Sequence, residues 1–407
     1  MGTSQTFWCL SDGQLIRLAI PAANNLGLNP KILWSSPSAS VFRLLWDPTG
    51  KAILIPNKNW LDEDSLRRFA WLVWEGNPVT TEWENVPAEA IEKLVSHWLV
   101  ARPNVEVIRK IQDRISEKEL AKWAWGTPVP YALIDSLETF RDQVRSLQPP
   151  CILKTRWGGY DGKWQWKITE KTNLEDFWKN TFPDKVPPLI LEKMIDLAYE
   201  ASVIVGIDTV GWMECIGPMY NIHENGILRL SIDPAPINNT ETQALLSEAK
   251  KIAWWVSSII DGYVWILTIE FFVDKNRKIY VNEFAPRPHN SGHTWLNSRD
   301  KNQNHLWLST ATGHAVEKSH LIRTVVMENI LSQRELVDYS QRRRVIDVPG
   351  FYDYQKLSSP PSPENVEVRK LWHMNHFWDE VEGWVGEFKE WKIDIEELNS
   401  RLRKRPL

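Results

Sequence analysis

Twelve consecutive residues, 282–293, bring together carboxylate, amide, guanidinium and imidazole side chains in the order Asn-Glu-Phe-Ala-Pro-Arg-Pro-His-Asn-Ser-Gly-His. Together with Glu270 upstream, this segment offers two carboxylates. Hard oxygen ligands of this kind suit Mg²⁺, which usually takes one or two protein carboxylates and completes its shell with phosphate oxygens and water. The segment therefore predicts a site for metal and phosphate. The alternative is a polar strand end in which a carboxylate pairs with Arg287.

Two predicted strands would position the two carboxylates. Residues 267–273 and 278–283 have the composition of strands, and the four polar residues between them are typical of a turn. If the first and last of these four residues close the turn, Glu270 lies opposite Val281. Glu283 is two positions further along the same face, roughly 7–8 Å away on the diagonal. The hairpin would then bring both carboxylates to one metal.

A glycine-containing loop between two further strands is suited to cover a phosphate. The predicted strands are 150–155 and 165–168, and the loop 156–164 between them contains three glycines. Lys154 would supply a point charge and the loop would supply backbone donors, which together suit a polyphosphate. A glycine-rich hairpin without a ligand is the alternative. The bulk of Trp164 is unexpected in such a loop.

The first hundred residues alternate short apolar runs with helical patterns, which predicts an open parallel sheet. The predicted elements are strand 6–10, helix 14–26, strand 31–34, strand 79–82 and helix 87–95. The first turn between strand and helix, 11–15, could present backbone N–H groups to an anion, although a purely structural turn is the alternative.

Later segments predict a change of domain and a nucleotide site. Residues 105–120 read as one amphipathic helix and 126–130 as a linker, so we place a boundary near residue 112. Strand 189–195 would end in a linker whose backbone could read the edge of a base. Glu200 could accept hydrogen bonds from ribose hydroxyls, or could simply face solvent.

The composition predicts a globular protein of two or three domains, since 43% of the 407 residues are hydrophobic and no apolar run approaches 18 residues. A net charge of −4 argues against nucleic-acid binding. Three scattered cysteines favour neither a disulfide framework nor a zinc cluster, so a reducing cytoplasm is expected. The 24 tryptophans need a large core or interface, and Trp71 is expected to face a core because of its helical spacing.

The order of these motifs resembles the carboxyaminoimidazole ribonucleotide synthetases, a family of ATP-grasp ligases, over nearly the whole chain. The matching segments are 12–15, 81–87, 112–114, 153–156, 158–163, 221–223, 226–229, 282–293 and 369–370 with His373. The ending at 289–293 favours this family over the related formate-dependent formyltransferases.

The resemblance implies an α/β fold of three domains. An N-terminal open parallel sheet (1–111) would precede an ATP-grasp domain (112–318) with two α+β lobes, a flap lobe at about 127–190 and a metal-binding lobe at about 191–318. A small β-rich domain (319–407) would follow. The resemblance also implies a homodimer. No nucleic-acid or membrane partner is expected, a cytoplasmic location is expected, and whether a separate mutase uses the product is left open.

The resemblance assigns roles residue by residue. ATP would be bound by Arg114, Lys154, Gly159, Tyr160, Asp161, Gly162, Lys163, Trp164, Gln165, Glu192, Lys193, Met194, Ile195, Glu200, His223, Asn282 and Glu283. Glu270 and Glu283 would hold Mg²⁺. The acceptor substrate and its phosphate would contact Gln14, Glu82, Asn290, Ser291, Lys356, Arg369 and Lys370, and catalysis would use Lys154, Arg287 and Asn290.

The implied activity is the ATP-dependent carboxylation of 5-aminoimidazole ribonucleotide by bicarbonate through carboxyphosphate, a step of purine biosynthesis. Trp164, Trp372 and Ile16 stand where the family has glycine, which allows a positive φ or a close approach of a ligand. Four hypotheses therefore remain open. They are a working ligase of this kind, a homologue that binds nucleotide with impaired catalysis, a different ATP-grasp ligase that acts on a carboxylate or bicarbonate, and a nonenzymatic nucleotide-binding or scaffold protein.

Overall fold

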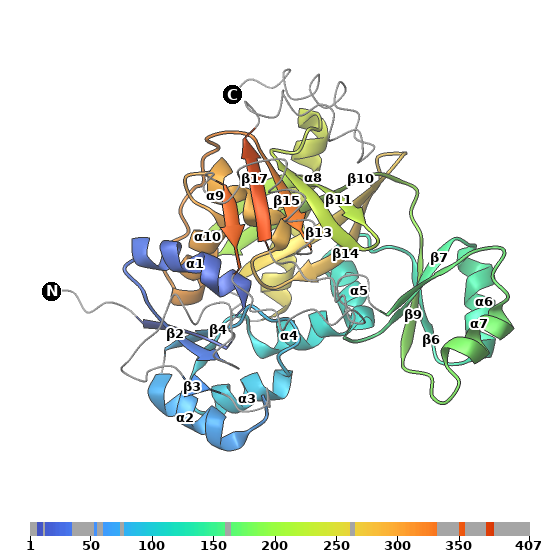
Figure 1. The fold of residues 1–407 in the computed structure, drawn as a ribbon, viewed down its shortest axis with the longest axis horizontal. Coiled ribbons are helices and arrows are strands. Elements are labelled where there is room, and N and C mark those ends of the chain that lie inside the picture. The colour runs from blue at the N-terminus through green and yellow to red at the C-terminus, as the bar shows by residue number, and fades with distance from the viewer. Residues whose placement is uncertain are drawn as a thin grey trace.

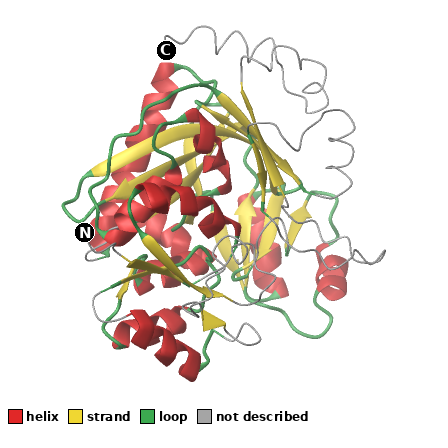
Figure 2. Cartoon of the chain, turned by 60° about the vertical axis from the view of Figure 1, so that its left-hand side comes forward, coloured by secondary structure: helices red, strands yellow, loops and turns green. Residues whose placement is uncertain are grey.

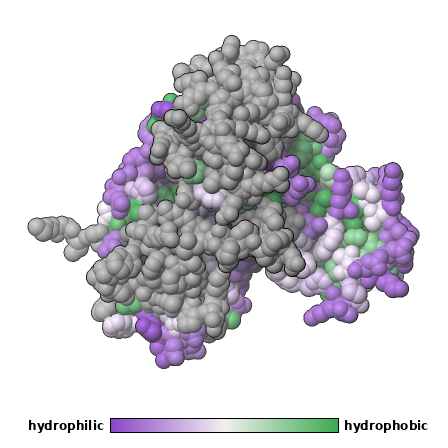
Figure 3. Space-filling view, viewed as in Figure 1, coloured by the Kyte–Doolittle hydropathy of each residue, from purple (hydrophilic) through white to green (hydrophobic). Residues whose placement is uncertain are grey.

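The computed structural model describes residues 6–10, 13–34, 53–54, 60–73, 77–158, 164–260, 265–331, 350–354 and 372–377. The described strands form three sheets. Figure 1 shows a small lobe of strands and helices that projects from a larger body. Figure 3 shows an indentation between the lobe and the body, with hydrophilic residues along the outer edge of the lobe. Within the described ranges, no helix combines the length and the apolar character that a membrane crossing requires.

The N-terminal sheet is parallel, as the sequence predicted, with the strand order β3-β2-β1-β4-β5. Its strands are β1 (Thr6–Cys9), β2 (Asn29–Trp34), β3 (Ile53–Leu54), β4 (Pro78–Thr80) and β5 (Val100–Ala101), and its helices are α1 (Gln14–Asn25), α2 (Glu63–Val73) and α3 (Ala88–Ser96). The prediction that Trp71 faces a core is wrong, because α2 buries Leu66 and Phe69 on one face and leaves the Trp71 side chain 76% exposed on the other.

The predicted helix 105–120 is two helices, α4 (Val105–Gln112) and α5 (Arg114–Trp123). Asp113 separates them with an extended backbone, and its carboxylate caps α5 by accepting a backbone N–H two residues later at 3.1 Å. The same carboxylate accepts two bonds from the Arg156 guanidinium, both at 2.6 Å. The break therefore falls next to the expected boundary at residue 112, and it attaches α5 to the loop that follows β7.

The flap lobe contains a four-stranded sheet in the order β6-β9-β7-β8 whose neighbours are all antiparallel. Its elements are β6 (Tyr131–Ile134), α6 (Leu137–Leu147), β7 (Cys151–Thr155), β8 (Gln165–Ile168), α7 (Leu174–Thr181) and β9 (Leu189–Lys193). Rings from both helices pack together, with the Phe140 and Trp178 centroids 5.3 Å apart. Residues 159–163, where the predicted flap would contact ATP, lie outside the described residues.

The largest sheet has the order β14-β13-β10-β11-β12-β15-β17-β16 and is antiparallel throughout. Its strands are β10 (Leu197–Ile207), β11 (Met213–Glu224), β12 (Ile227–Asp233), β13 (Ile266–Asp274), β14 (Ile279–Ala285), β15 (Val325–Ile330), β16 (Phe351–Asp353) and β17 (Trp372–Phe377). Residue 318 is the predicted end of the ATP-grasp domain. Because β12 pairs with β15, strands from both sides of this boundary belong to the same sheet. The division into domains stays a prediction.

The associated helices are α8 (Asn239–Ile259), the 3-10 helix η2 (Asn290–Thr294), α9 (Trp295–Ser298) and α10 (Gln303–Thr312). Helix α10 contacts β10 and β13 of the large sheet and β4 of the parallel sheet, and Figure 2 shows helices in the space between these sheets. The Trp307 indole N–H donates to the Thr80 hydroxyl at 3.1 Å across this contact. Trp265, Trp295 and Trp307 are all fully buried, so the core takes up part of the unusual tryptophan content.

Candidate active site

The predicted hairpin forms as β13 and β14, but its register differs from the expectation. The turn closes between its expected first and last residues, with an N–H to O distance of 2.9 Å. Phe271 then pairs with Val281, whereas Glu270 pairs with Glu283. The prediction that Glu270 lies opposite Val281 is wrong for two reasons. The Asp274 N–H donates to the Lys278 carbonyl at 3.1 Å, so the strands pair one residue later than expected, and Asn282 is then an extra residue that forms a bulge on β14. The two carboxylates are therefore direct cross-strand neighbours rather than diagonal ones.

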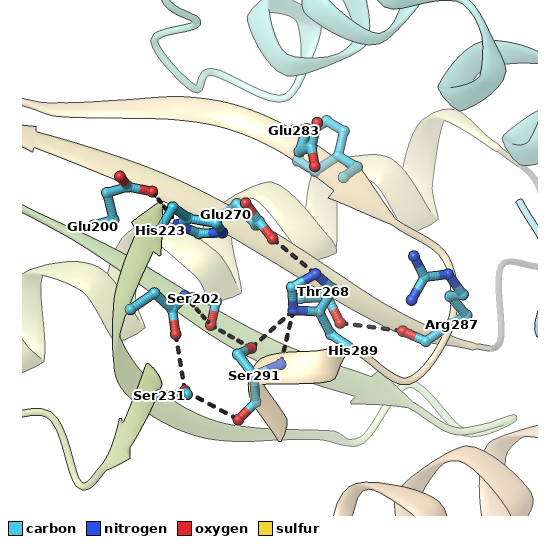
Figure 4. A network of polar contacts seen from close by, with 12 residues as sticks. Glu200, Ser202, His223, Ser231, Thr268, Glu270, Glu283, Arg287, His289 and Ser291 are labelled. Atoms are coloured by element: carbon cyan, nitrogen blue, oxygen red, sulfur yellow. Dashed lines mark hydrogen bonds and ion pairs between the residues drawn. The ribbon is translucent and has the colours of Figure 1, made fainter. Parts of the chain in front are cut away.

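One face of the large sheet carries most of the polar side chains of the site (Figure 4). Directly paired residues share a face of a sheet, and so do alternate residues along one strand. Two rows of paired residues run across the strands, namely Glu283, Glu270 and Ser202, then Glu200, Asn221 and Ser231. The antiparallel register thus collects residues that are up to 83 positions apart (283 − 200) into one polar surface.

Glu270 is the buried member of the carboxylate pair. Its Oε1 lies 2.8 Å from Nε2 of His289, and its side chain is 9% exposed. Burial opposes its ionisation, but the imidazoles of His289 and His223 and the Arg287 guanidinium outweigh burial and lower the pKa of Glu270 to about 2. The carboxylate is therefore ionised at neutral pH, as a metal ligand must be.

Glu283 is the accessible member of the pair, with a side chain 42% exposed and Oε2 at 3.4 Å from Nη1 of Arg114. The two carboxylates fit Mg²⁺, which prefers oxygen ligands. Within the described ranges, no group of three or more His, Cys, Asp and Glu side chains is arranged to hold a metal. An ion bound by Glu270 and Glu283 would therefore complete its shell with phosphate oxygens and water.

Cationic side chains surround a buried carboxylate beside this pair. Lys154 Nζ lies 2.6 Å from Oε2 of Glu192, and Lys118 Nζ lies 3.3 Å from its Oε1. Burial opposes the charge on Glu192, but Lys118, Lys154 and Arg114 overcome it and hold the pKa of that carboxyl well below its usual range. The structure thus brings three of the predicted nucleotide-binding side chains, Arg114, Lys154 and Glu192, into one cluster.

The sequence analysis missed two charged residues of this cluster, Glu117 and Lys118 on α5. Lys118 donates to the backbone carbonyl of Asn282, and the Phe284 N–H donates to the Glu117 carboxylate at 2.6 Å. Burial, together with the nearby Glu283 carboxylate, raises the pKa of Glu117 to about 8. The Glu-Lys pair on one helix was visible in the sequence, but only the tertiary contact of α5 with β14 reveals its partners.

His223 and Glu200, both predicted to bind the nucleotide, face each other on neighbouring strands. Nδ1 of His223 lies 2.7 Å from Oε2 of Glu200. Burial disfavours the imidazolium, but the carboxylates of Glu200, Glu270 and Glu283 outweigh it and raise the pKa of His223 to about 9. The ring is therefore a cation at neutral pH and adds to the positive charge available to a phosphate.

The stability contributed by the pair of His223 and Glu200 is expected to depend on pH. Because folding raises the pKa of His223 from 6.5 to about 9, this stability is fully present below pH 6.5 and is lost as the pH rises through 9. His223→Gln should lower the free energy of unfolding by at most about 3 kcal/mol at low pH and by much less at high pH. Urea unfolding of the protein without nucleotide checks this. An exposed control, His97→Gln, should show no such pH dependence, and a difference between wild type and His223→Gln that stays constant with pH would contradict the prediction.

The turn between β1 and α1 donates its backbone N–H groups to a carboxylate of the protein itself. The carboxylate of Glu82, which is buried, accepts backbone N–H bonds from Gly13, from Leu15 at 2.6 Å and from Ile16 at 3.0 Å. The purely structural interpretation of this turn is therefore confirmed for these three N–H groups. Ile16 lies in the helical part of α1 and is fully buried, so its position requires no glycine. Gln14, predicted to contact substrate, is the first residue of α1.

The predicted substrate residues of η2 differ in how their polar atoms are used. Asn290 is 6% exposed, and neither atom of its side-chain amide has a hydrogen-bond partner among the described residues. A buried amide of this kind is a group that a bound ligand can satisfy. Ser291 is fully buried, and its hydroxyl contacts Ser202 and His289 instead. Nη2 of Arg287 lies 2.7 Å from Oε1 of Glu84. The alternative interpretation, a salt bridge of Arg287 with a carboxylate, is therefore present, but the carboxylate lies outside the predicted metal site.

The remaining predicted residues fall into two groups. Lys193, Met194 and Ile195 form the segment at the end of β9, where the N–H groups of Lys193 and Met194 donate to carbonyls of residues 130 and 150 at 2.8 and 3.0 Å. Gln165 begins β8. Gly159, Tyr160, Asp161, Gly162, Lys163, Lys356, Arg369 and Lys370 lie outside the described residues, and their roles stay predictions.

Trp164 has the left-handed backbone that favours glycine, with φ at 59°, and its side chain is 62% exposed. A left-handed conformation costs roughly 1–2 kcal/mol for residues with a Cβ atom. Trp164→Gly is therefore expected to be about 1 kcal/mol more stable to urea unfolding than the matched Trp164→Ala, which removes the indole but keeps the Cβ. Equal stabilities would contradict a strained backbone at this position.

Comparisons with known proteins identify a domain in this chain. A model of the ATP-grasp domain matches residues 121–303. The N5-carboxyaminoimidazole ribonucleotide synthase of Staphylococcus aureus is 32% identical over 258 residues, which cover 63% of this chain and 66% of that protein, slightly less than two thirds. The enzyme of the same name from Staphylococcus saprophyticus is 29% identical over 273 residues, which cover 67% of this chain and 70% of that protein.

Solved structures match over almost the full length. An N5-carboxyaminoimidazole ribonucleotide synthetase in complex with ADP superimposes with a TM-score of 0.80 at 26% identity, covering 96% of this chain and 97% of that one. The chain thus contains an ATP-grasp domain and has the fold of such a synthetase. Within that class, the chain resembles the N5-carboxyaminoimidazole ribonucleotide synthases, and the resemblance predicted from its motifs is confirmed.

Proposed function

We propose that the protein is an ATP-grasp ligase that carboxylates 5-aminoimidazole ribonucleotide with bicarbonate, converts ATP to ADP and phosphate, and serves purine biosynthesis. The observation that carries the proposal is the direct pairing of Glu270 with Glu283, because it sets two carboxylates that would hold a metal side by side, with Glu283 3.4 Å from the Arg114 guanidinium. The names of the relatives and the nearly complete overlap with a solved synthetase support the choice of substrate.

The nucleotide would lie between the segment after β9 and the hairpin of β13 and β14. Lys154 and Arg114 would neutralise the phosphate oxygens, since both cations already face carboxylates at the site. Glu270 and Glu283 would hold Mg²⁺, which when bound orients the phosphates and offsets their charge. The imidazolium of His223 would add a further positive charge next to Glu200, the proposed ribose ligand.

The proposed reaction activates bicarbonate, which is a poor electrophile. An oxygen of bicarbonate attacks the γ-phosphorus of ATP, the bond from that phosphorus to the bridging oxygen breaks, and ADP leaves with carboxyphosphate as the other product. Carboxyphosphate then separates into carbon dioxide and phosphate. The substrate amine attacks carbon dioxide and loses a proton, which gives the carbamate. This chemistry needs positioning and charge neutralisation rather than a protein nucleophile, in agreement with the residue types present.

The acceptor side of the site is proposed around η2. The amide of Asn290, which has no hydrogen-bond partner among the described residues, and the guanidinium of Arg287 would hold bicarbonate and carboxyphosphate next to Lys154. Gln14 and the segments that contain Lys356, Arg369 and Lys370 would receive the ribonucleotide and its phosphate. Glu82 and Ser291, whose polar atoms are bonded internally, would shape this pocket. The domain boundaries, the homodimer, the cytoplasmic location and the separate mutase stay predictions.

The test is a turnover assay on the full chain with ATP, Mg²⁺, bicarbonate and 5-aminoimidazole ribonucleotide. ADP release in step with consumption of the ribonucleotide is the expected result, and omission of bicarbonate should abolish both. ATP binding without turnover would favour the homologue with impaired catalysis, and turnover only with another acceptor would favour a different ATP-grasp ligase. If neither ATP nor the ribonucleotide binds, the working ligase, the impaired homologue and the different ATP-grasp ligase are all contradicted.

A further inference from the structure

Helix α5 presents a stripe of residues to the flap lobe, and Figure 1 shows this helix between the lobe and the larger body. Arg114, Lys118 and Lys122 are spaced by four residues, so they lie on one face of α5. Two of them contact the lobe through their side chains. Lys118 lies 3.3 Å from Glu192 on β9, and Lys122 lies 2.7 Å from the Tyr131 hydroxyl on β6. The third, Arg114, is attached to the lobe through its backbone.

The backbone of Arg156 joins the start of α5 to the lobe. Arg156 follows β7, and its carbonyl accepts the Arg114 N–H at 3.2 Å. Its own N–H donates to the carbonyl of Pro188, the residue before β9, at 2.9 Å. This one residue therefore connects two strands of the lobe with the first residue of α5.

The side chain of Arg156 strengthens this connection. Its Nε and Nη2 donate to the two carboxylate oxygens of Asp113, each at 2.6 Å, and a bidentate pair fixes orientation as well as distance. The carboxylate is held in place because it also accepts from the Ile115 N–H at 3.1 Å and the Ser116 hydroxyl at 3.0 Å. The guanidinium carbon lies over the Trp157 ring, 4.6 Å from its centroid. The indole thus limits the access of water to one face of the ion pair.

This joint connects the two cations that would neutralise phosphate in the proposed function. Lys154 is on β7 of the lobe, whereas Arg114 begins α5. No single element carries both cations, so the contacts between the lobe and α5 set the distance between them. Arg156 lies two residues after Lys154, and it bonds to both Asp113 and Arg114.

We propose that Arg156 is a positioning residue that sets the spacing of Lys154 and Arg114, so that both cations reach the phosphates of one nucleotide. Its ion pair with Asp113 carries this role, and the indole of Trp157 supports it by keeping water away. The proposal rests on the nucleotide part of the proposed function and is independent of the acceptor substrate. A displacement of about 1 Å can lower turnover roughly 100-fold, so a joint outside the site can control it.

The first test compares ATP with adenosine, which has no phosphates, as ligands of the full chain. Isothermal titration calorimetry at fixed Mg²⁺ measures both affinities. Arg156→Gln should weaken ATP binding roughly 10-fold, about the effect of losing one charge-assisted hydrogen bond, and leave adenosine binding unchanged. Arg145→Gln is the matched control, because it makes the same chemical change at an exposed side chain of α6 and should alter neither affinity.

The second test separates positioning from simple electrostatics. Asp113→Asn removes a negative charge next to the proposed phosphate site, so electrostatics alone would strengthen ATP binding. Positioning predicts the opposite, an affinity roughly 10-fold weaker, and α5 should be retained because asparagine caps a helix as well as aspartate does. Adding Arg156→Gln to Asp113→Asn should cause no further loss, since both changes break the same contact. Arg156→Lys keeps the charge but cannot form two parallel bonds, so it should restore only part of the affinity.

Trp157→Ala tests the contribution of the indole. Without the ring, water and salt should screen the ion pair, so ATP binding should weaken by a smaller factor than in Arg156→Gln. In an Arg156→Gln background, the same change should have no effect, because no ion pair is left to cover. An equal loss in both backgrounds would contradict this role of the indole.

Three results would overturn the proposal. They are stronger or unchanged ATP binding in Asp113→Asn, wild-type ATP affinity in Arg156→Lys, and a loss of adenosine affinity in Arg156→Gln that equals the loss of ATP affinity. The Asp113→Asn result decides the question even if Arg156→Gln does not fold. A wild-type protein that binds no ATP would contradict both this proposal and the proposed function, whereas ATP binding without turnover would contradict only the proposed function.

Discussion

Replacing Glu283 by glutamine is expected to raise the Mg²⁺ concentration that supports half-maximal ADP release by more than about 100-fold. Glu283 is one of two paired carboxylates, and the amide that replaces it is neutral. Because the side chain is 42% exposed, its replacement opens no cavity and the fold should be retained. Titration of Mg²⁺ at fixed ATP measures the effect on turnover, and Mn²⁺ binding measures it without turnover.

The control for Glu283→Gln is Glu175→Gln, which makes the same chemical change at an exposed glutamate of α7 that lies 2.6 Å from Arg141. This control should leave the Mg²⁺ dependence unchanged. Glu283 also lies near Arg114, so the competing explanation is that it only orients this guanidinium for ATP. An unchanged Mg²⁺ dependence together with a weaker affinity for ATP would support that explanation and contradict a metal ligand.

The parts of the fold that the sequence predicted well are those set by local patterns. The parallel N-terminal sheet follows from alternating strand and helix patterns, and the hairpin follows from two apolar strands around a polar turn. The register of that hairpin could not be predicted. It depends on where strand pairing begins after the turn, at Asp274 and Lys278, and on the bulge at Asn282. The Asn282 carbonyl accepts from Lys118, a residue 164 positions earlier in the chain.

Other errors show which sequence information was present but ambiguous. Asp113 is a favoured capping residue, so the break between α4 and α5 had a local signal within an otherwise continuous helical pattern. Helical spacing alone could not tell that Trp71 lies on the solvent side of α2. The two polar rows that contain Ser202 and Ser231 required the pairing of five strands, which only the tertiary fold supplies.

Replacing Lys118 by methionine is expected to lower the free energy of unfolding by about 3–5 kcal/mol. Its side chain is 1% exposed, and its ammonium group lies 3.3 Å from Glu192 and donates to the Asn282 carbonyl. Methionine fills nearly the same volume, so no cavity forms. The loss arises because the buried Glu192 carboxylate loses one of its neighbouring cations and the Asn282 carbonyl loses its hydrogen-bond donor. Urea unfolding of the protein without nucleotide measures the change.

Lys122→Met is the matched control for Lys118→Met, because Lys122 lies one turn further along α5 with a side chain 49% exposed, and its replacement should cost within about 0.5 kcal/mol. Adding Glu192→Gln to Lys118→Met should recover part of the loss, since the glutamine leaves no buried charge to neutralise. Equal effects of the two lysine variants would mean that water reaches Glu192 and screens it. Because Lys118 joins α5 to both β9 and the hairpin, Lys118→Met should also weaken ATP binding, and Lys122→Met should not.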